Sequence, residues 1–288
     1  MNKLFVVFAA GEDHVRLVNR TAIVTGASRG LGRAITLALA AEGATVVAAA
    51  RTSSRGDDTL EGSLDDTVEA ARQLGGTAVP ITCDVQVDED LVKLVDAAAA
   101  TGNLSLLVNN AAWTVPGKPG KRPPARAPGQ AAGAAPVLES PVWAARKQFD
   151  VNLFAPWRLM QLAVAVMTDT GGGAIVNVSS EAARMPHGPP AYGASKLALE
   201  FLTRAVAAEL EAVGISVHAL VPSLPIETPG LAWVGGAPGE HQSPEDFAEA
   251  VVRLALPDAA ATSGTVVYSA DVLDPSRPAR RWLGSSLA

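Results

Sequence analysis

Two side chains four residues apart, Tyr192 and Lys196, are the strongest candidates for chemistry in this sequence. On a helix, residues at this spacing lie on one face. A free tyrosine has a pKa near ~10 and exchanges protons poorly at neutral pH. A nearby ammonium favours the phenolate, so we expect Lys196 to lower the pKa of Tyr192 towards the range that general acid–base catalysis needs. The pair therefore predicts a proton donor or acceptor.

A serine pair, Ser179 and Ser180, ends the apolar stretch that precedes this helix. A serine hydroxyl at the end of a strand can hydrogen-bond the oxygen of a substrate carbonyl and orient it. A serine hydrolase is disfavoured, because the sequence has no G-x-S-x-G motif and no plausible histidine partner. The histidines and the cysteine are scattered, and no spacing among them resembles a metal site, so we expect no metal.

A glycine-rich segment, TGASRGLG at residues 25–32, joins an apolar run to a helical pattern. Its glycines allow a tight turn and a close approach of the backbone to a pyrophosphate, which would lie on the helix N-terminus. The strand–turn–helix context favours a dinucleotide site, although a glycine-rich turn can also be only a turn.

The elements that must position these residues alternate along the chain. Short apolar runs predict seven strands, at residues 21–25, 44–50, 77–85, 105–111, 173–180, 215–222 and 264–269. Helical patterns separate them, and this alternation predicts a Rossmann-type α/β fold. We expect a doubly wound, mostly parallel seven-stranded sheet with helices on both faces. Before the fifth strand we predict one long helix over 140–167, with Ser140 as its N-cap and Pro141 at its first position.

The pattern predicts a single catalytic domain over residues 15–270, with an N-terminal extension at 1–14 and a C-terminal tail at 271–288. A stretch rich in Pro, Gly and Ala, residues 113–136, interrupts it. Because the alternation resumes after this stretch, we interpret it as an enlarged surface loop and not as a linker between domains. It follows the fourth strand, at the sheet edge where open α/β sheets bind ligands.

The bulk composition excludes several classes of function. The chain has 288 residues and a net charge of −6, which disfavours binding to nucleic acid or to an anionic membrane. A single cysteine, Cys83, excludes an internal disulfide and fits the cytoplasm. The apolar run at residues 4–10 is far shorter than the ~20 residues that span a bilayer.

The motifs together resemble the short-chain dehydrogenase/reductase family over residues 15–270: the turn T-G-x-x-x-G-x-G, then Asn109-Asn110-Ala111, Asn152, the serine pair, and Y-x-x-x-K. The resemblance implies that Tyr192 is the proton donor, that Lys196 also binds the nicotinamide ribose, and that Asn152 supports a water-linked proton relay. Ser180 matches the family's local pattern, and Ser179 matches the usual interval to the tyrosine. We expect Ser180 to act and keep Ser179 as the alternative.

The choice of cofactor follows from charge. An acid at the end of the second strand would bind the ribose 2′-hydroxyl of NAD and repel a 2′-phosphate. Here that strand runs into Arg51, and Arg29 lies in the glycine turn, so NADP(H) is favoured over NAD(H). By resemblance, the cofactor-binding residues are Gly26, Ser28, Arg29, Gly30, Leu31, Gly32, Arg51, Asp84, Val85, Asn110, Ala111, Tyr192, Lys196, Ile226 and Thr228.

The sequence departs from the family pattern at two places in the loops after the predicted strands. Ala112 replaces a glycine after Asn109-Asn110-Ala111, and Ser223-Leu224 replaces a glycine before Ile226. Neither change removes a candidate catalytic side chain.

The sequence therefore predicts an NADP(H)-dependent carbonyl reductase or alcohol dehydrogenase that acts on a small molecule. The alternatives are a non-catalytic NADP-binding sensor or scaffold, and an NAD-dependent alcohol or hydroxysteroid dehydrogenase of the same family. The resemblance also implies a homodimer or homotetramer.

Overall fold

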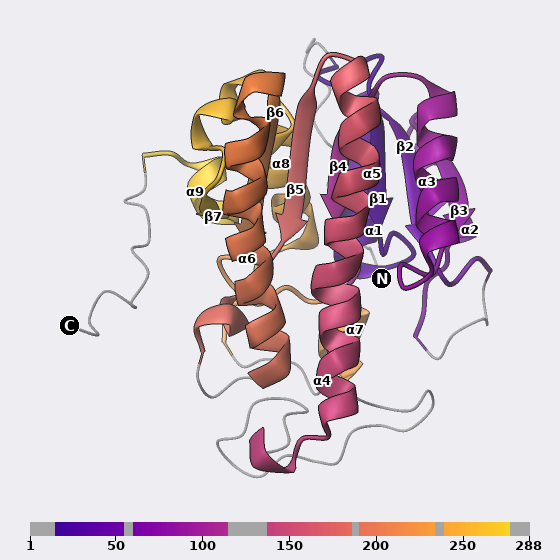
Figure 1. Cartoon of the computed structure of the whole chain (residues 1–288). Coiled ribbons are helices and arrows are strands. Elements are labelled where there is room, and N and C mark those ends of the chain that lie inside the picture. Colours follow the sequence, from indigo (N-terminus) through magenta and orange to yellow (C-terminus); the bar gives the residue numbers. More distant parts are fainter. Residues whose placement is uncertain (1–14, 55–59, 115–136, 186–189, 234–238, 277–288) are drawn as a thin grey trace.

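The computed structural model describes residues 15–54, 60–114, 137–185, 190–233 and 239–276. Its seven strands form one sheet in the order β3-β2-β1-β4-β5-β6-β7 (Figure 1). All neighbouring strands run parallel, which confirms the predicted fold. The strands are β1 (Thr21–Thr25), β2 (Thr45–Ala50), β3 (Thr77–Thr82), β4 (Leu104–Asn109), β5 (Gly173–Val178), β6 (Ile215–Val221) and β7 (Val266–Tyr268). The predicted N-terminal extension and nearly all of the Pro-rich loop lie outside the described residues.

Helices connect the strands in the alternation that the sequence predicts. They are α1 (Gly30–Ala41), α2 (Leu64–Gln73), α3 (Asp88–Thr101), α4 (Val142–Phe149), α5 (Ala155–Asp169), α6 (Pro190–Leu210), α7 (Pro229–Trp233), α8 (Pro244–Leu254) and α9 (Ser269–Leu273). Short 3₁₀ turns are η1 (Val137–Glu139), η3 (Glu181–Arg184), η4 (Glu211–Val213) and η5 (Pro257–Thr262), and η2 (Asp150–Phe154) is a π-helical turn.

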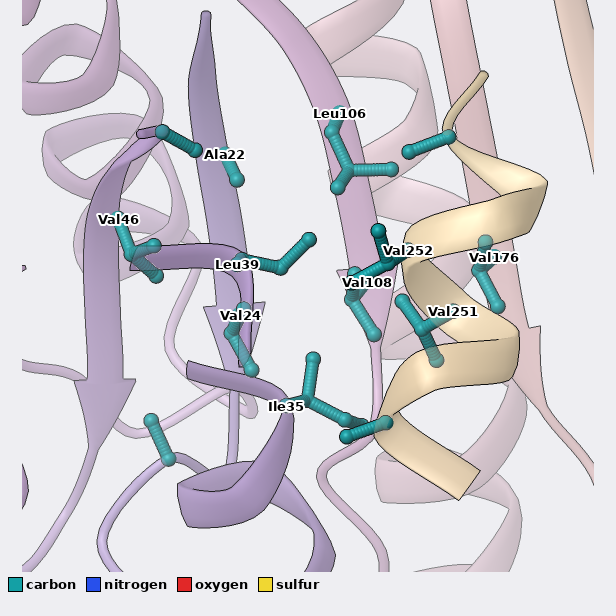
Figure 2. Close-up of a cluster of buried hydrophobic side chains, with 14 of the residues drawn as sticks. Ala22, Val24, Ile35, Leu39, Val46, Leu106, Val108, Val176, Val251 and Val252 are labelled. Carbon is teal, nitrogen blue, oxygen red and sulfur yellow. The ribbon is translucent and has the colours of Figure 1, made fainter. Parts of the chain in front are cut away.

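Two hydrophobic clusters hold the helices to the two faces of the sheet. In one, Leu39 of α1 and Val251 of α8 pack against Val24 and Val108 (Figure 2). The other lies under α3, α5 and α6, which stand in front of the sheet in Figure 1. Because both faces are covered, every residue of β1, β4 and β6 is buried. The rigid sheet thus brings the ends of its strands to one edge.

The predicted long helix before β5 is present, but its predicted N-terminus is wrong. Pro141 is the N-cap of α4, and Ser140 belongs to the preceding turn, where its backbone N–H donates to the carbonyl of Val137 at 3.3 Å. Pro141 has an extended conformation (ψ 131°), so it cannot be the first helical residue. The helical path then continues through the π-helical turn η2, so that α4, η2 and α5 form one continuous helix over residues 142–169, as the sequence predicts.

Candidate active site

Tyr192 and Lys196 lie in the first turns of α6 and share one face, as their spacing predicts. Lys196 is almost completely buried and Tyr192 is half-buried. The Lys196 ammonium lies 5.8 Å from the centre of the Tyr192 ring. It donates a hydrogen bond of 2.7 Å to the carbonyl of Val178, the last residue of β5. The pair therefore faces the end of β5.

The two serines that follow β5 point in different directions. Ser180 is hydrogen-bonded to the Tyr192 hydroxyl. Ser179 donates instead to a carboxylate oxygen of Glu200 at 2.5 Å. Side chains of successive residues in an extended chain point to opposite sides, and this alternation separates the two hydroxyls. The geometry therefore favours Ser180 over Ser179 as the partner of Tyr192.

Burial dominates the protonation of this pair. It raises the pKa of Tyr192, and only the hydrogen bond from Ser180 acts in the other direction. Burial lowers the pKa of Lys196 to about 8, against the opposing charge of Glu200. The prediction that Lys196 lowers the pKa of Tyr192 is therefore contradicted. The physical reason is that the ammonium is directed at the Val178 carbonyl, while partial burial disfavours the charged phenolate.

Asn152 lies in the π-helical turn η2 and is fully buried. Its Oδ1 accepts a hydrogen bond of 2.8 Å from the backbone N–H of Trp113. Its Nδ2 donates to the Trp113 carbonyl at 3.2 Å and to Ser195 Oγ at 3.0 Å. Asn152 thus ties the chain beyond β4 to α6. Single π-helical turns of this kind occur frequently at functional sites.

The glycine turn between β1 and α1 forms a cradle without side chains. Gly26 and Gly30 have positive φ angles of 69° and 52°, which favour glycine. A Cβ at Gly32 would lie 2.1 Å from the carbonyl oxygen of Gly26, so that only glycine fits there. The side chain of Arg29, the N-cap residue of α1, makes no capping hydrogen bond, so the backbone N–H groups of the first turn can bind an anion. Ser28 is buried beneath the turn, and Leu31 packs on the hydrophobic cluster under α1.

Two arginines flank the end of β2, as predicted. Arg29 donates from Nη2 to Thr52 Oγ1 at 3.0 Å and to the Gly62 carbonyl at 3.3 Å. These bonds direct its guanidinium across the end of β2. Arg51 is exposed to solvent. Thr52 was not identified from the sequence as the residue that holds the Arg29 guanidinium. Its position directly after Arg51, at the end of β2, was the available signal.

The two candidates after β3 differ in their surroundings. Asp84 is held in its own turn, where its carboxylate accepts from the backbone N–H of Gln86 at 3.0 Å. Val85 is partly buried and packs on the cluster under α3 and α5. Val85, Ala111 and Thr25 line one small pocket at the sheet edge.

Thr25 organises the end of β4, a role that sequence reasoning missed. Its Oγ1 accepts hydrogen bonds of 3.0 Å from the backbone N–H groups of Asn110 and Ala111. The Asn110 side chain in turn donates to the Thr25 carbonyl at 2.8 Å. The chain after β4 is therefore fastened to the glycine turn, although Ala112 replaces the family glycine. The threonine directly before Gly26 was the signal available in the sequence.

The segment after β6 reaches the glycine turn despite its departure from the family pattern. Ile226 is buried and forms an isolated parallel bridge with Gln242. A Cβ at Gly30 would lie 3.3 Å from the Thr228 side chain, so Thr228 is close to the turn. Thr228 Oγ1 also accepts a hydrogen bond of 3.1 Å from the backbone N–H of Leu231. Thr228, Gly30 and Asn110 thus gather around one turn.

Aromatic side chains lie beside Asn152. The rings of Trp113 and Trp143 are 6.4 Å apart, and the Lys147 ammonium lies 5.4 Å from the Trp113 ring centre. Residues 115–136 of the predicted loop lie outside the described part of the chain. Within the described part, no group of His, Cys, Asp and Glu residues could hold a metal ion, and no helix is long and apolar enough to cross a membrane.

Comparison with known proteins points to one family. Residues 20–232 match the family model described as short chain dehydrogenase. The 7alpha-hydroxysteroid dehydrogenase of Escherichia coli K12 is 29% identical, over 88% of this chain and 94% of that protein.

Solved structures give the same result. A 7 alpha-hydroxysteroid dehydrogenase complexed with NADH and 7-oxo glycochenodeoxycholic acid superposes with a TM-score of 0.74 and 28% identity, covering 90% of this chain and 95% of that one. A putative NAD(P)-dependent gluconate 5-dehydrogenase from Beutenbergia cavernae, with bound NADP, superposes with a TM-score of 0.70 and 29% identity, covering 91% and 99%.

Proposed function

Because the chain belongs to the short-chain dehydrogenase family, and is thus an oxidoreductase, we propose that it uses NADP(H) to interconvert a ketone or aldehyde and an alcohol. One observation carries the proposal. The hydrogen-bonded side chains of Ser180 and Tyr192, beside the buried Lys196, lie at the sheet edge that also carries the glycine turn. We assign this function to one domain over residues 15–270, with an inserted loop at 113–136.

Tyr192 is the proposed proton donor and acceptor. Its raised pKa keeps the phenol protonated at neutral pH, which suits donation of that proton to a carbonyl oxygen in the reductive direction. Lys196, with a pKa of about 8, carries a positive charge at pH 7 and stabilises the phenolate that remains. Ser180, beside the Tyr192 hydroxyl, orients the carbonyl oxygen by a second hydrogen bond. Asn152, bonded to Trp113 and Ser195, holds the surrounding segments and supports the proton relay in that way.

The glycine cradle fits a dinucleotide. The site offers the unobstructed backbone of Gly26, Gly30 and Gly32 and the uncapped N-terminus of α1 to a pyrophosphate. Thr228, Asn110 and Lys196 border the same region. When bound, the nicotinamide exchanges a hydride with the carbonyl carbon.

The preference for NADP(H) rests on Arg29. Its guanidinium is held at the end of β2 by Thr52 and Gly62. Arg51 directly follows the last residue of β2, and the sequence has no acid at this strand end. Two positive charges favour a 2′-phosphate over a free ribose hydroxyl. An NAD-dependent hydroxysteroid dehydrogenase is the second candidate, favoured by the similar structure that holds NADH and a 7-oxo bile acid.

We also propose a homodimer or homotetramer in the cytoplasm. Large apolar side chains of η2, α5 and α6 are exposed: Phe154, Trp157, Leu197 and Phe201. A second copy of the chain would remove this apolar surface from water. Light scattering of the wild type and of Phe201→Glu tests this assembly, because the charged variant should dissociate.

One experiment tests the proposed function. Purified protein is incubated with a panel of cyclic ketones, 3-oxoacyl thioesters, aldehydes and the corresponding alcohols, each with NADPH and with NADH, and absorbance at the reduced nicotinamide is followed. We expect turnover with at least one carbonyl substrate and higher kcat/KM with NADPH. Higher kcat/KM with NADH would favour the second candidate, and cofactor binding without turnover of any compound would favour a sensor or scaffold.

A further inference from the structure

A buried ion pair lies one helical turn beyond Lys196. The carboxylate of Glu200 on α6 is 1% exposed, and the guanidinium of Arg184 at the end of η3 is 10% exposed. Two parallel hydrogen bonds join them, from Nη1 to Oε1 at 2.9 Å and from Nη2 to Oε2 at 2.7 Å. Ser179 adds a third hydrogen bond to Oε1 at 2.5 Å. All polar atoms of the Glu200 carboxylate are therefore engaged by the segment that follows β5.

These bonds fasten the segment carrying Ser180 to the helix carrying Tyr192. Lys196 makes a second attachment through the Val178 carbonyl, 2.7 Å away. A third is a direct backbone contact, because a Cβ at Gly193 would lie only 2.4 Å from the carbonyl oxygen of Ala182. Ser180 is thus bracketed by attachments on both sides in the sequence. The ion pair is the only one of the three that carries a charge on both partners.

We propose that Arg184 and Glu200 are positioning residues for the reaction: the pair holds Ser180 against Tyr192 and sets the electrostatic potential at Tyr192 and Lys196. The inference rests on the proposed function, since it assigns the ion pair a part in the same proton transfer. Neither residue touches the reacting atoms. Both act through Ser180, Tyr192 and Lys196.

Other titratable groups lie on elements that pack against α6: Glu181 and Arg184 of η3, Lys147 of α4, Asp150 of η2 and His218 of β6. Glu181 of η3 accepts a hydrogen bond of 2.9 Å from the Tyr268 hydroxyl of β7. Arg184 lies over the ring of Tyr268, 5.8 Å from its centre. From α4, which also packs on α6, Lys147 lies over Trp113. Glu200 lies one helical turn from Lys196, and its charge opposes the fall in the pKa of Lys196.

The two partners should therefore shift the pH dependence in opposite directions. Glu200→Gln removes a negative charge and leaves Arg184 unbalanced, so it lowers the pKa of Tyr192 and of Lys196. Arg184→Gln leaves the carboxylate unbalanced and raises both pKa values. Glu200 lies one helical turn from Lys196 and about two turns from Tyr192, so we expect a shift of about one pH unit for Lys196 and a smaller shift of the same sign for Tyr192. A pair that only stabilised the fold would lower activity without such opposed shifts.

The test measures the pKa of Tyr192 directly and does not require turnover. The chain contains 2 tyrosines, Tyr192 and Tyr268, so ¹³C-labelling of tyrosine gives two NMR signals, which Tyr268→Phe assigns. Titrations compare the wild type, Glu200→Gln, Arg184→Gln and the charge-conserving Arg184→Lys. Glu69→Gln is the matched control, because it breaks an Arg–Glu pair that is exposed on α2.

We expect the Tyr192 signal to titrate lower in Glu200→Gln, higher in Arg184→Gln, and near the wild-type value in Arg184→Lys and Glu69→Gln. The kcat–pH profile of an identified substrate should move in the same directions. Shifts of equal sign, or shifts no larger than that of Glu69→Gln, overturn the inference even if the enzyme is active. If one single variant does not fold, the sign of the other still decides. Failure of the proposed function is distinguishable from failure of this inference. In that case the wild type turns over no substrate, while the NMR titrations of its tyrosines can still be compared with those of the variants.

Discussion

The substitution Gly32→Ala tests the cradle most sharply. Its Cβ would lie 2.1 Å from the carbonyl oxygen of Gly26 and 2.6 Å from Nδ2 of Asn110. Both distances are well below the shortest normal contact of a Cβ, and the first partner is backbone, which cannot rotate away. The glycine turn must therefore move as a unit, and with it the N-terminus of α1.

Relief of such an overlap typically costs about 1–3 kcal/mol. If all of this free energy weakens cofactor binding, the Kd for NADPH increases roughly five- to 150-fold. Part of the strain can instead lower the free energy of unfolding, so thermal unfolding is measured alongside.

Isothermal titration with NADPH gives the Kd of each variant. Gly230→Ala is the control, because the nearest atom to its Cβ is Thr228 Oγ1, 3.9 Å away. We expect the Kd of this control to stay within about twofold of the wild type. A folded Gly32→Ala protein that binds NADPH as tightly as the wild type would refute the assignment of the cradle.

Three further predictions follow from the same geometry. Arg29→Ala should lower the ratio of kcat/KM for NADPH to kcat/KM for NADH by about ten- to 100-fold, because a charge-assisted contact is lost. Arg51→Ala should lower this ratio less, and steady-state kinetics with both cofactors measure both effects. Ser180→Ala should reduce kcat by about 10²–10³ and Ser179→Ala by less than about tenfold, because only Ser180 bonds Tyr192. Burial lowers the pKa of His218 to about 4, so the folded protein favours the neutral imidazole. The contribution of His218 to the free energy of unfolding is therefore fully present above pH ~6.5 and is lost as the pH falls towards 4. Chemical denaturation between pH 7 and pH 4 should show a smaller loss of stability in His218→Leu; an equal loss in both proteins would exclude His218 as a cause.

Much of the site could be predicted because its residues occupy fixed points of a regular alternation. Gly26, Asn110 and Tyr192 each stand at the end of a strand or at the start of a helix, where hydrophobic periodicity changes. A parallel sheet brings those points to one edge, so their proximity follows from the fold class. Side-chain spacing on α6 likewise follows from helix geometry.

The remainder depends on contacts that no local pattern encodes. The π-helical turn at Asn152 adds one residue to a helix whose hydrophobic pattern continues through it. The choice between Ser179 and Ser180 depends on the direction of each side chain, which is set by Glu200 on another element. The raised pKa of Tyr192 comes from burial, and burial is a property of the packed molecule. Sequence spacing alone therefore predicted the wrong sign for that shift.

We propose that Tyr192 transfers the proton, and that a bound NADP(H) would supply or accept the hydride at the carbonyl carbon. The most direct measurement follows NADPH oxidation with the best ketone of the panel, for the wild type and for Tyr192→Phe, after titration has shown that both bind NADPH equally. We expect that the variant retains cofactor binding and loses turnover by at least about 10²-fold. Turnover by Tyr192→Phe close to the wild-type rate would contradict it.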